Sequence, residues 1–478
     1  MRARRARRRW GNHGSGFVER RSGVHRSRAR RWARTVTVMA VGAALAGCLP
    51  IYKPMPATKI VGELAPDSVL AACPPIGTRT TVSANTHLDP ACTYSGVLVS
   101  TSNVVLDCRG ARIIDPPGGQ SWQRGIEISA PVTTALTGVT VRNCYTEGFT
   151  NGLRVTRTGF KTLAEGTEYD VAFSNIRIEN SWFHKSNGSG VFVDGYVTGV
   201  TLRSIEVTQA GSVGVYLEAG SKDNVIELSY IHGNGFADAD PAGQPKVIGG
   251  TTFMYQGTGR EGIAVDGSRN NVIRGNVITA NSAGGIFFYK NCGEFATQEP
   301  AQHWTRRYGA DGNLVELNVF SNEHTGVWLG SRMAENQTFM DCSDPAYVDV
   351  PFKVVHLDHA AGNTIRNNSF ETVEIGVHIE DDGNVVEANR FASATSTHRA
   401  VVVGTRERLS VLGLPTDGST ITGNVSEIAG NTKPFTWVHG HTNTTFTGNL
   451  RGTRAATLAA GTAIPSNPFL MVLRIWVP

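Results

Sequence analysis

A glycine followed by alternating aliphatic residues recurs through the middle of the chain. The pattern Gly-[Ile/Val/Leu]-x-[Ile/Val/Leu] or its close variants begins at Gly125, Gly152, Gly190, Gly214, Gly262, Gly285, Gly326 and Gly376. The shortest intervals between copies are 23 and 24 residues. A single strand of this kind cannot bury its apolar face alone, but stacked copies can. The chain is therefore predicted to be a solenoid with coils of about 23 residues.

A second phrase, centred on asparagine, lies between the glycine copies. It begins at Asn224, Asn271, Asn313, Asn363 and Asn384. Asparagine suits tight bends because it tolerates left-handed backbone angles and bonds its own neighbours. Residues at equivalent corners of stacked coils are expected to form an internal amide ladder. Apolar residues alternate at period two, and no segment after residue 50 shows a sustained helical period, so the fold class is all-β.

These repeats resemble those of the right-handed parallel β-helix, the solenoid of pectate lyases and related polysaccharide-acting proteins. The resemblance covers roughly residues 80–450 and implies about ten coils with capped ends. We expect a signal peptide over 1–47, a tether and cap start over 48–78, the β-helix over 79–450 and a C-terminal cap over 451–478. The fold alone does not specify a reaction, because function resides in sites grafted on folds.

The N-terminus has the pattern of a secretory signal. Basic residues precede a short apolar run that ends in Leu45-Ala46-Gly47-Cys48. This ending resembles a bacterial lipobox, which implies a lipid on Cys48 and attachment to the membrane of the cell envelope. The alternative is an ordinary signal peptide with a chance cysteine.

Removing the leader changes the net charge. Residues 1–47 contain 13 of the 45 Lys and Arg and 1 of the 40 Asp and Glu, so 32 basic and 39 acidic residues remain, a net −7. Binding to nucleic acid is not indicated. An acidic substrate would need local basic groups or a bridging cation.

Six cysteines besides Cys48 fit an oxidising compartment. Cys73 and Cys92 could staple the entry to the first coil, and Cys292 and Cys342 could join two insertions. Cys108 and Cys144 occupy equivalent places in the repeat and could simply stack as small apolar residues, although the sequence leaves the pairing open.

Longer intervals between glycine copies indicate four insertions. They fall at about 157–172, 233–258, 291–312 and 331–360, directly before or after the glycine-led strand. Long loops on one face of a regular rod are usually functional. They are expected to form walls around this strand face.

The aliphatic residues of the glycine-led strand point inward, so the second and fourth residues after glycine point outward. The outward columns contain the aromatic-rich set Phe192, Tyr216, Phe287, Trp328 and His378 and the set Asp194, Glu218, Asp266 and Tyr289. Strands in register lie about 4.8 Å apart, so Asp194, Glu218 and Asp266 are predicted to stack on consecutive coils as solvent-facing side chains.

Stacked carboxylates repel unless they are protonated, paired or bridged by a cation. They could bind Ca²⁺, which takes six to eight oxygen ligands, or supply the acid and base of glycoside hydrolysis. The alternative is a solvated acidic surface. The aromatic side chains could stack on sugar rings, or the insertions could bury them as a small core.

Lys290 follows Tyr289, and Arg306, Arg307 and Arg332 follow in the next insertions. This grouping is similar to calcium-dependent polysaccharide lyases of the pectate lyase and chondroitinase B type. The resemblance implies that Lys290 removes the proton α to a uronate carboxylate while an arginine holds that carboxylate.

The leading prediction is therefore cleavage of a uronate-containing polysaccharide by β-elimination. Glycoside hydrolysis by the stacked carboxylates, C5-epimerisation and non-catalytic glycan binding remain open. The polygalacturonase and alginate-epimerase signatures are absent, and the sequence does not indicate the oligomeric state.

Overall fold

The computed structural model describes the chain from residue 60 to residue 452, with gaps. The described ranges are 60–118, 123–238, 244–248, 251–255, 259–291, 306–331, 334–335, 348–350, 353–356, 359–438 and 440–452. Cys48, Cys292, Arg332 and Cys342 lie outside them. Helices in these ranges are α1 (Arg406–Leu412), η2 (Phe160–Thr162) and η3 (Phe236–Asp238), and none is long and apolar enough to span a bilayer.

Three long parallel sheets, here named A, B and C, contain most of the strands. Sheet A runs in the order β1 (Val69–Ala71), β3 (Thr86–Leu88), β6 (Val105–Asp107), β9 (Thr140–Arg142), β12 (Ile176–Glu179), β15 (Val200–Arg203), β18 (Val225–Glu227), β23 (Val272–Arg274), β26 (Leu314–Glu316), β32 (Thr364–Arg366), β35 (Val385–Glu387), β39 (Thr420–Thr422) and β43 (Thr445–Thr447). Sheet B runs in the order β2 (Thr80–Val82), β5 (Val97–Val99), β8 (Arg124–Pro131), β11 (Asn151–Thr158), β14 (Val191–Val193), β17 (Val215–Leu217), β22 (Glu261–Asp266), β25 (Gly284–Tyr289), β28 (Thr325–Leu329), β34 (Ile375–Ile379), β37 (Arg399–Val403) and β41 (Phe435–Trp437). Sheet C runs in the order β4 (Thr93–Tyr94), β7 (Arg112–Ile114), β10 (Tyr145–Glu147), β13 (Trp182–His184), β16 (Glu206–Thr208), β19 (Tyr230–His232), β24 (Val277–Thr279), β27 (Val319–Ser321), β33 (Ser369–Glu371), β36 (Arg390–Ser393), β40 (Val425–Ile428) and β44 (Leu450–Arg451).

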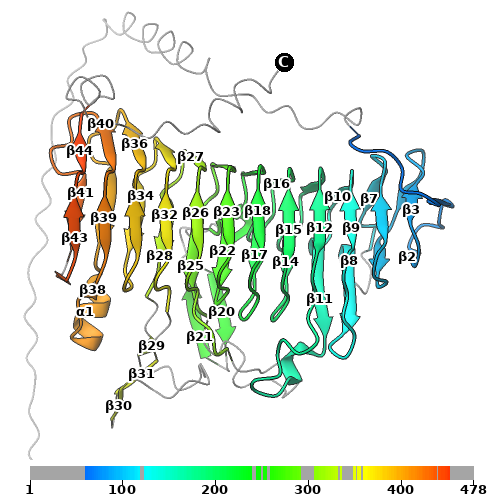
Figure 1. Ribbon diagram of the computed structural model, residues 1–478, viewed down its shortest axis with the longest axis horizontal. Helices are drawn as coiled ribbons and strands as arrows, with labels where there is room; N and C mark the ends of the chain where they lie inside the picture. The colour runs from blue at the N-terminus through cyan, green and yellow to red at the C-terminus, as the bar shows by residue number, and fades with distance from the viewer. Residues whose placement is uncertain are drawn as a thin grey trace, which may run out of the picture. The chain divides into compact units, whose positions relative to one another are not determined.

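The chain visits sheets A, C and B in turn and then starts the next coil. Each strand pairs in parallel with its counterpart on the neighbouring coil, so the described chain forms a right-handed parallel β-helix (Figure 1). The predicted fold class is confirmed. Inward-facing residues of all three sheets form one continuous core, in which Phe320, Phe370 and Phe391 stack with ring centroids 4.7 Å apart.

Two buried asparagine ladders connect the coils, as the repeat predicted. In the first, each side-chain amide donates to the side-chain oxygen of the next asparagine along Asn224, Asn271, Asn313, Asn363 and Asn384. The second runs along Asn276, Asn318, Asn368, Asn389, Asn424 and Asn449. From the second member of each ladder onward, the side-chain oxygen also accepts the backbone N–H of the ladder residue on the preceding coil. For example, the Asn318 N–H donates to Oδ1 of Asn368. Backbone groups at the corners, where strand pairing stops, are thereby satisfied.

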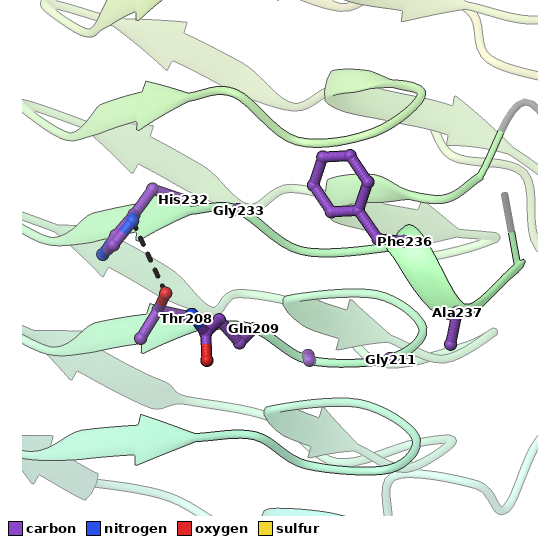
Figure 2. Close-up of a pocket in the computed structure, with 8 residues that line it drawn as sticks. Thr208, Gln209, Gly211, His232, Gly233, Phe236 and Ala237 are labelled. Carbon is purple, nitrogen blue, oxygen red and sulfur yellow. Dashed lines mark hydrogen bonds between the residues drawn. The ribbon is translucent and has the colours of Figure 1, made fainter.

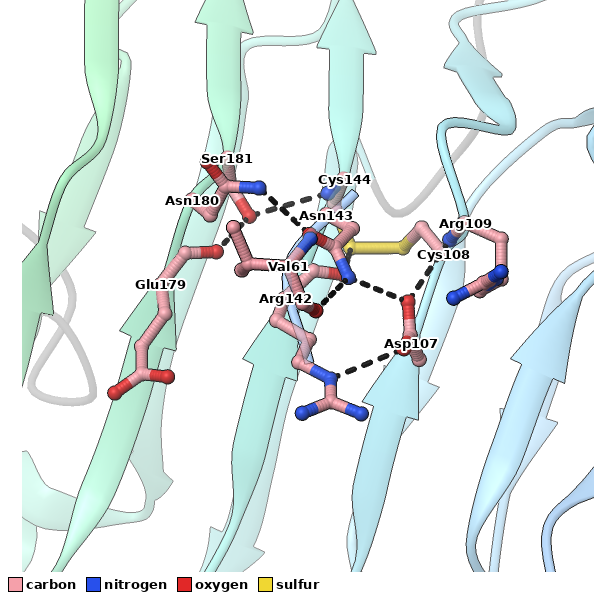
Figure 3. The surroundings of a disulfide bond; sticks show 10 residues. All are labelled: Val61, Asp107, Cys108, Arg109, Arg142, Asn143, Cys144, Glu179, Asn180 and Ser181. Carbon is pink, nitrogen blue, oxygen red and sulfur yellow. Dashed lines mark hydrogen bonds and ion pairs between the residues drawn. A yellow bond between two sulfur atoms is a disulfide. The ribbon is translucent and has the colours of Figure 1, made fainter. Parts of the chain in front are cut away.

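Two disulfides connect early parts of the fold. Cys73 pairs with Cys92, one of the arrangements considered from the sequence. Cys108 pairs with Cys144, so the two do not merely stack, which was the possibility considered from the sequence. They follow neighbouring strands of sheet A, so their alignment in the repeat brings them close enough to bond. Asn143 beside the bridge also bonds Asp107 and the backbone of Val61 (Figure 3).

The predicted insertions interrupt the coil next to sheet B. η2 lies in the first, the hairpin of β20 (Gln244–Ile248) and β21 (Thr251–Tyr255) in the second, and β29 (Ala334–Glu335), β30 (Val348–Val350) and β31 (Lys353–His356) in the fourth. Figure 1 shows β20–β21, β29–β31 and α1 along one edge of the β-helix. A last small sheet pairs β38 (Thr416–Asp417) with β42 (His441–Thr442).

Candidate functional site

Strand register in sheet B aligns the predicted outward column. The aligned residues are Glu127, Arg154, Phe192, Tyr216, Ala264, Phe287, Trp328 and His378. Asp194, Glu218 and Asp266 come directly after the aligned residues Val193, Leu217 and Val265. The three acids therefore occupy equivalent positions on consecutive coils, at the ends of strands β14, β17 and β22.

The acids are buried, which corrects the expectation that they face solvent. Their exposed fractions are 1% for Asp194, 9% for Glu218 and 0% for Asp266. Residues that the repeat pattern does not include cover them, notably Arg306 and Asn291 from the insertion after β25. A carboxylate enclosed in this way must be paired or protonated.

Asp194 is paired with an arginine from the preceding coil. The Arg154 guanidinium donates from Nε and Nη2 to the two Asp194 carboxylate oxygens over 2.7 and 2.8 Å. This bidentate geometry fixes both groups and requires the ionised carboxylate. The same guanidinium lies 5.0 Å from the centre of the Phe192 ring, so ring and ion pair form one surface.

Asp266 is held by neutral donors. The Tyr216 hydroxyl donates to one of its oxygens over 2.5 Å, and the Asn291 backbone N–H donates to the other over 2.6 Å. The Asn291 side-chain amide donates to the Tyr216 hydroxyl over 3.2 Å. Asp266 thus locks Tyr216 and the start of the insertion in place.

Glu218 lies between the other two acids and has the weakest pairing. Its Oε1 accepts the Ala219 N–H over 3.0 Å and lies 3.5 Å from an Arg306 nitrogen. Burial raises the pKa of Glu218 to about 7, opposed by Arg306 and assisted by the negative charges of Asp266 and Asp194. The column therefore holds one carboxyl that titrates near neutral pH beside one that is ion-paired.

Lys161 of η2 is the cation that the sequence prediction missed. Burial lowers the pKa of its amine, while Glu218 and Asp194 oppose that shift through their charges. It lies within the first predicted insertion, so its segment could be identified from repeat spacing. Arg154 was visible in the outward column, but its contact with Asp194 depends on the exact rotamers.

The residues do not fit a preassembled calcium site. Among the described residues, Asp194, Glu218 and Asp266 do not form a group whose ligand oxygens all lie within 4.8 Å of one another. The carboxylate oxygens already have partners in the protein. Asp194 is paired with Arg154, Glu218 lies beside Arg306, and Asp266 accepts hydrogen bonds from Tyr216 and Asn291. Arginine and calcium would compete for the same oxygens.

Of the other predicted catalytic residues, Lys290 directly follows Tyr289, which is aligned with Asp266, and directly precedes Asn291, whose N–H bonds Asp266. Lys290 is 2% exposed, and its charge lowers the pKa of Asp311, which burial raises. Arg307 pairs with Glu168 over 3.2 Å and with Glu165 over 3.3 Å. Arg306 of the predicted basic set lies 3.5 Å from Glu218 of the acidic column.

The aromatic residues divide into buried and half-exposed members. Tyr216 and Tyr289 are buried, and the Tyr289 hydroxyl donates to Glu261 over 2.6 Å. Phe192 stacks on Tyr216 with centroids 4.8 Å apart, and Phe287 meets Trp328 edge-on at 5.3 Å. Phe192, Phe287 and Trp328 are partly buried against this small core and keep some exposed surface. His378 lies half-buried at the far end of the column, 3.5 Å from Glu380.

Comparison with known proteins supports the fold. Residues 125–299 match the family described as a right-handed beta helix region. No curated protein matches the chain.

Several solved structures share the architecture at low identity. The A-module of an Azotobacter vinelandii mannuronan C-5 epimerase is 12% identical with a TM-score of 0.44, covering 78% of this chain and 88% of that one. A tailspike protein of E. coli bacteriophage HK620, in complex with a hexasaccharide, is 10% identical with a TM-score of 0.43, covering 81% and 59%. An alginate lyase from a Paenibacillus species is 13% identical with a TM-score of 0.34, covering 78% and 98%. These similarities are too weak to assign an activity.

Proposed function

We propose that this protein is a polysaccharide-acting glycoside hydrolase whose site is the acidic column of sheet B. The observation that carries the proposal is the pair Glu218 and Asp194. Burial raises the pKa of Glu218 to about 7, and Asp194 on the neighbouring coil forms a bidentate ion pair with Arg154. A carboxyl of raised pKa beside an ion-paired carboxylate can supply the acid and the nucleophile of glycoside hydrolysis.

In this mechanism Glu218 protonates the oxygen of the departing sugar. Asp194 attacks the anomeric carbon, and a water that Glu218 then deprotonates releases the product. Adjacent strands lie about 4.8 Å apart, which suits the carboxyl separation of about 5–5.5 Å that retaining enzymes use. The half-exposed rings of Phe192, Phe287 and Trp328 offer apolar surface for sugar rings along the same strands.

The geometry gives less support to the predicted elimination by Lys290. That lysine is buried, and its charge acts on Asp311. A different lysine favours elimination as the second candidate. Lys161 has a pKa lowered by burial and lies near Glu218 and Asp194, so it could act as the base.

A glycan panel distinguishes the two candidates. Hydrolysis produces reducing ends without ultraviolet absorbance, whereas elimination produces an absorbing unsaturated uronate. We expect reducing ends alone, an activity that falls as pH rises through about 7 when Glu218 loses its proton, and no loss with EDTA. If ultraviolet absorbance appears and Lys161→Ala abolishes it, the reaction is elimination and not hydrolysis. If no glycan yields either product, the protein is a glycan-binding protein without this activity.

The leaving group provides a sharper test of Glu218. Glu218→Gln should lose activity on the natural glycan but retain cleavage of an aryl glycoside whose phenolate needs no proton. Asp194→Asn should lose both activities, because the nucleophile is needed for either substrate. Equal losses on both substrates in Glu218→Gln would contradict the role of Glu218 as the acid.

The predicted lipid on Cys48 would place this activity at the bacterial cell envelope. Cys48→Ala should release the protein from the membrane fraction without changing its specific activity. Unchanged fractionation of Cys48→Ala would refute the anchor.

A further inference from the structure

The outer face of sheet C, whose strand directly precedes the sheet B strand in each coil, carries a cluster of aromatic and histidine side chains. Register aligns Tyr145, Trp182, Glu206 and Tyr230 in one column, and Glu147, His184, Thr208 and His232 in the next. Trp182 lies 4.9 Å from both Tyr145 and His184, and Tyr230 stacks on His232 at 4.0 Å. Trp182 and Tyr230 are two strands apart, roughly 10 Å.

Glu206 lies between Trp182 and Tyr230 and is only 4% exposed. Its Oε1 lies 2.9 Å from Nε2 of His232, but its Oε2 has no hydrogen-bond partner among the described residues. Trp182 Nε1 and His184 Nδ1 also lack partners there. Buried polar atoms are seldom left unsatisfied, so this concentration on one face needs an explanation.

A cavity of about 500 Å³ adjoins this face at the turn between sheets C and B. Thr208, Gln209, His232 and Phe236 line it together with the backbone of Gly211 and Gly233 (Figure 2). Phe236 is 57% exposed, which is unusual for a large apolar ring at a cavity wall. The cavity thus combines an aromatic wall with the hydrogen-bonding groups of Thr208, Gln209 and His232.

We propose that this face of sheet C and the adjoining cavity form a second saccharide-binding site that accepts a neutral glycan. Trp182 and Tyr230 would stack on sugar rings, and the Thr208, Gln209 and His232 groups would bond hydroxyls. The one carboxylate at the centre is paired with His232, so the site attracts neither a polyanion nor a strong cation.

A metal site does not account for the cluster. Among the described residues, His184, Glu206 and His232 do not bring three ligand atoms within 4.8 Å of one another. Aromatic surface with a few placed polar groups is the usual composition of a small-molecule site. The proposal goes beyond the hydrolase function and does not depend on it, because binding is measured without catalysis.

Affinity electrophoresis tests the site directly. The Glu218→Gln protein, in which hydrolysis of the gel matrix should be strongly lowered, would be run through native gels containing xylan, galactomannan, mixed-linkage β-glucan or dextran. We expect retardation by at least one of these neutral glycans. Phe236→Ala and Trp182→Phe should each weaken retardation about threefold to tenfold, the effect of losing one aromatic contact. Phe446→Ala, which removes a phenylalanine of 43% exposure elsewhere, should not.

Tryptophan fluorescence gives a second readout that does not depend on the gel. The retarding glycan should change the emission, and Trp182→Phe should reduce that change, while Trp437→Phe, outside both sites, retains it. No retardation by any of the four glycans would overturn the proposal. So would retardation that Phe236→Ala and Trp182→Phe leave intact. Since Phe236 is exposed and Trp182→Phe is conservative, circular dichroism should confirm that both variants fold.

Discussion

Sheets A and B place charged residues on aligned positions in opposite ways. On sheet A the outward column alternates in sign over nine strands, as Asp107, Arg142, Glu179, Arg203, Glu227, Arg274, Glu316, Arg366 and Glu387. At the ends of the sheet B strands, three acids follow one another on consecutive coils. Opposite charges on neighbouring strands stabilise a sheet, and like charges destabilise it.

The charged residues of sheet A stabilise the fold by pairing with one another, whereas the acids of sheet B form the candidate site. Glu227 of sheet A bonds both Arg274 and Arg203 on the adjacent strands, and these arginines lower its pKa against the effect of burial. Glu218 of sheet B has acids on both neighbouring coils, and burial raises its pKa. Three acids on consecutive coils destabilise the fold by repulsion between like charges. Their presence therefore indicates a function that offsets this destabilisation.

The largest expected effect is on activity, and it is measured by the same Glu-to-Gln substitution on sheet B and on sheet A. Glu218→Gln should lower hydrolysis of the natural glycan by about 10²- to 10⁴-fold, the contribution of a general acid. Glu227→Gln makes the same change on sheet A and should leave hydrolysis near wild type. Reducing-end assays of both variants check this, and equal activity in the two would break the comparison.

The same pair of variants should shift stability in opposite directions. The folded Glu218 carboxyl has a pKa raised from 4.5 to about 7, so its protonated form favours folding and stability falls as pH rises between these values. Glu218→Gln should therefore gain about 3 kcal/mol above pH 7 and nothing near pH 4, at about 1.4 kcal/mol per pKa unit.

Glu227 has a lowered pKa, so its stabilising effect is present above 4.5 and is lost as pH falls through the folded value. Glu227→Gln should destabilise at neutral pH and approach wild type in acid. Urea unfolding at pH 4 and pH 8 measures both variants. Shifts of the same sign would show that the two carboxyls occupy equivalent environments.

Much of the fold was predictable because each coil has the same sequence pattern. Each glycine-led strand and each ladder asparagine such as Asn318 satisfies the same local requirement on every coil. Periodicity therefore identified the coil, the ladders and the outward column of sheet B. Cys108 and Cys144 were aligned by the same argument, but alignment could not distinguish stacking from bonding.

The candidate site was predictable only in its backbone frame. Which strand ends carry Asp194, Glu218 and Asp266 follows from register. Their burial does not, because the groups that enclose them come from segments outside the repeat, such as Arg306 and Lys161. Non-periodic segments have no register to fix them, so their contacts with the acids could not be predicted from the repeat.

Building a like-charge column on sheet A should produce a smaller stability effect. Arg203→Glu places three acids, at 179, 203 and 227, on consecutive strands without arginines from an insertion to pair them. It should destabilise by about 1–2 kcal/mol from two like-charge contacts and a lost ion pair. Urea unfolding at low salt measures the loss, and 0.5 M NaCl should reduce it by screening. Wild-type hydrolysis in this variant is expected, since the site is on another sheet.

The smallest effect on stability is expected on sheet A, where an acid such as Glu227 has an arginine on both neighbouring strands and keeps one when the other is removed. Arg274 bonds Glu227 over 2.7 Å but has 48% of its side chain exposed, and Glu227 retains Arg203 when Arg274 is removed. Arg274→Met should thus cost less than about 1 kcal/mol, because exposed ion pairs contribute little. Urea unfolding at neutral pH measures the difference. A loss above about 2 kcal/mol would mean that the alternating column acts as one cooperative network. In that case its charges would be as interdependent as those of the acidic column, and sign alternation alone could no longer separate fold from function.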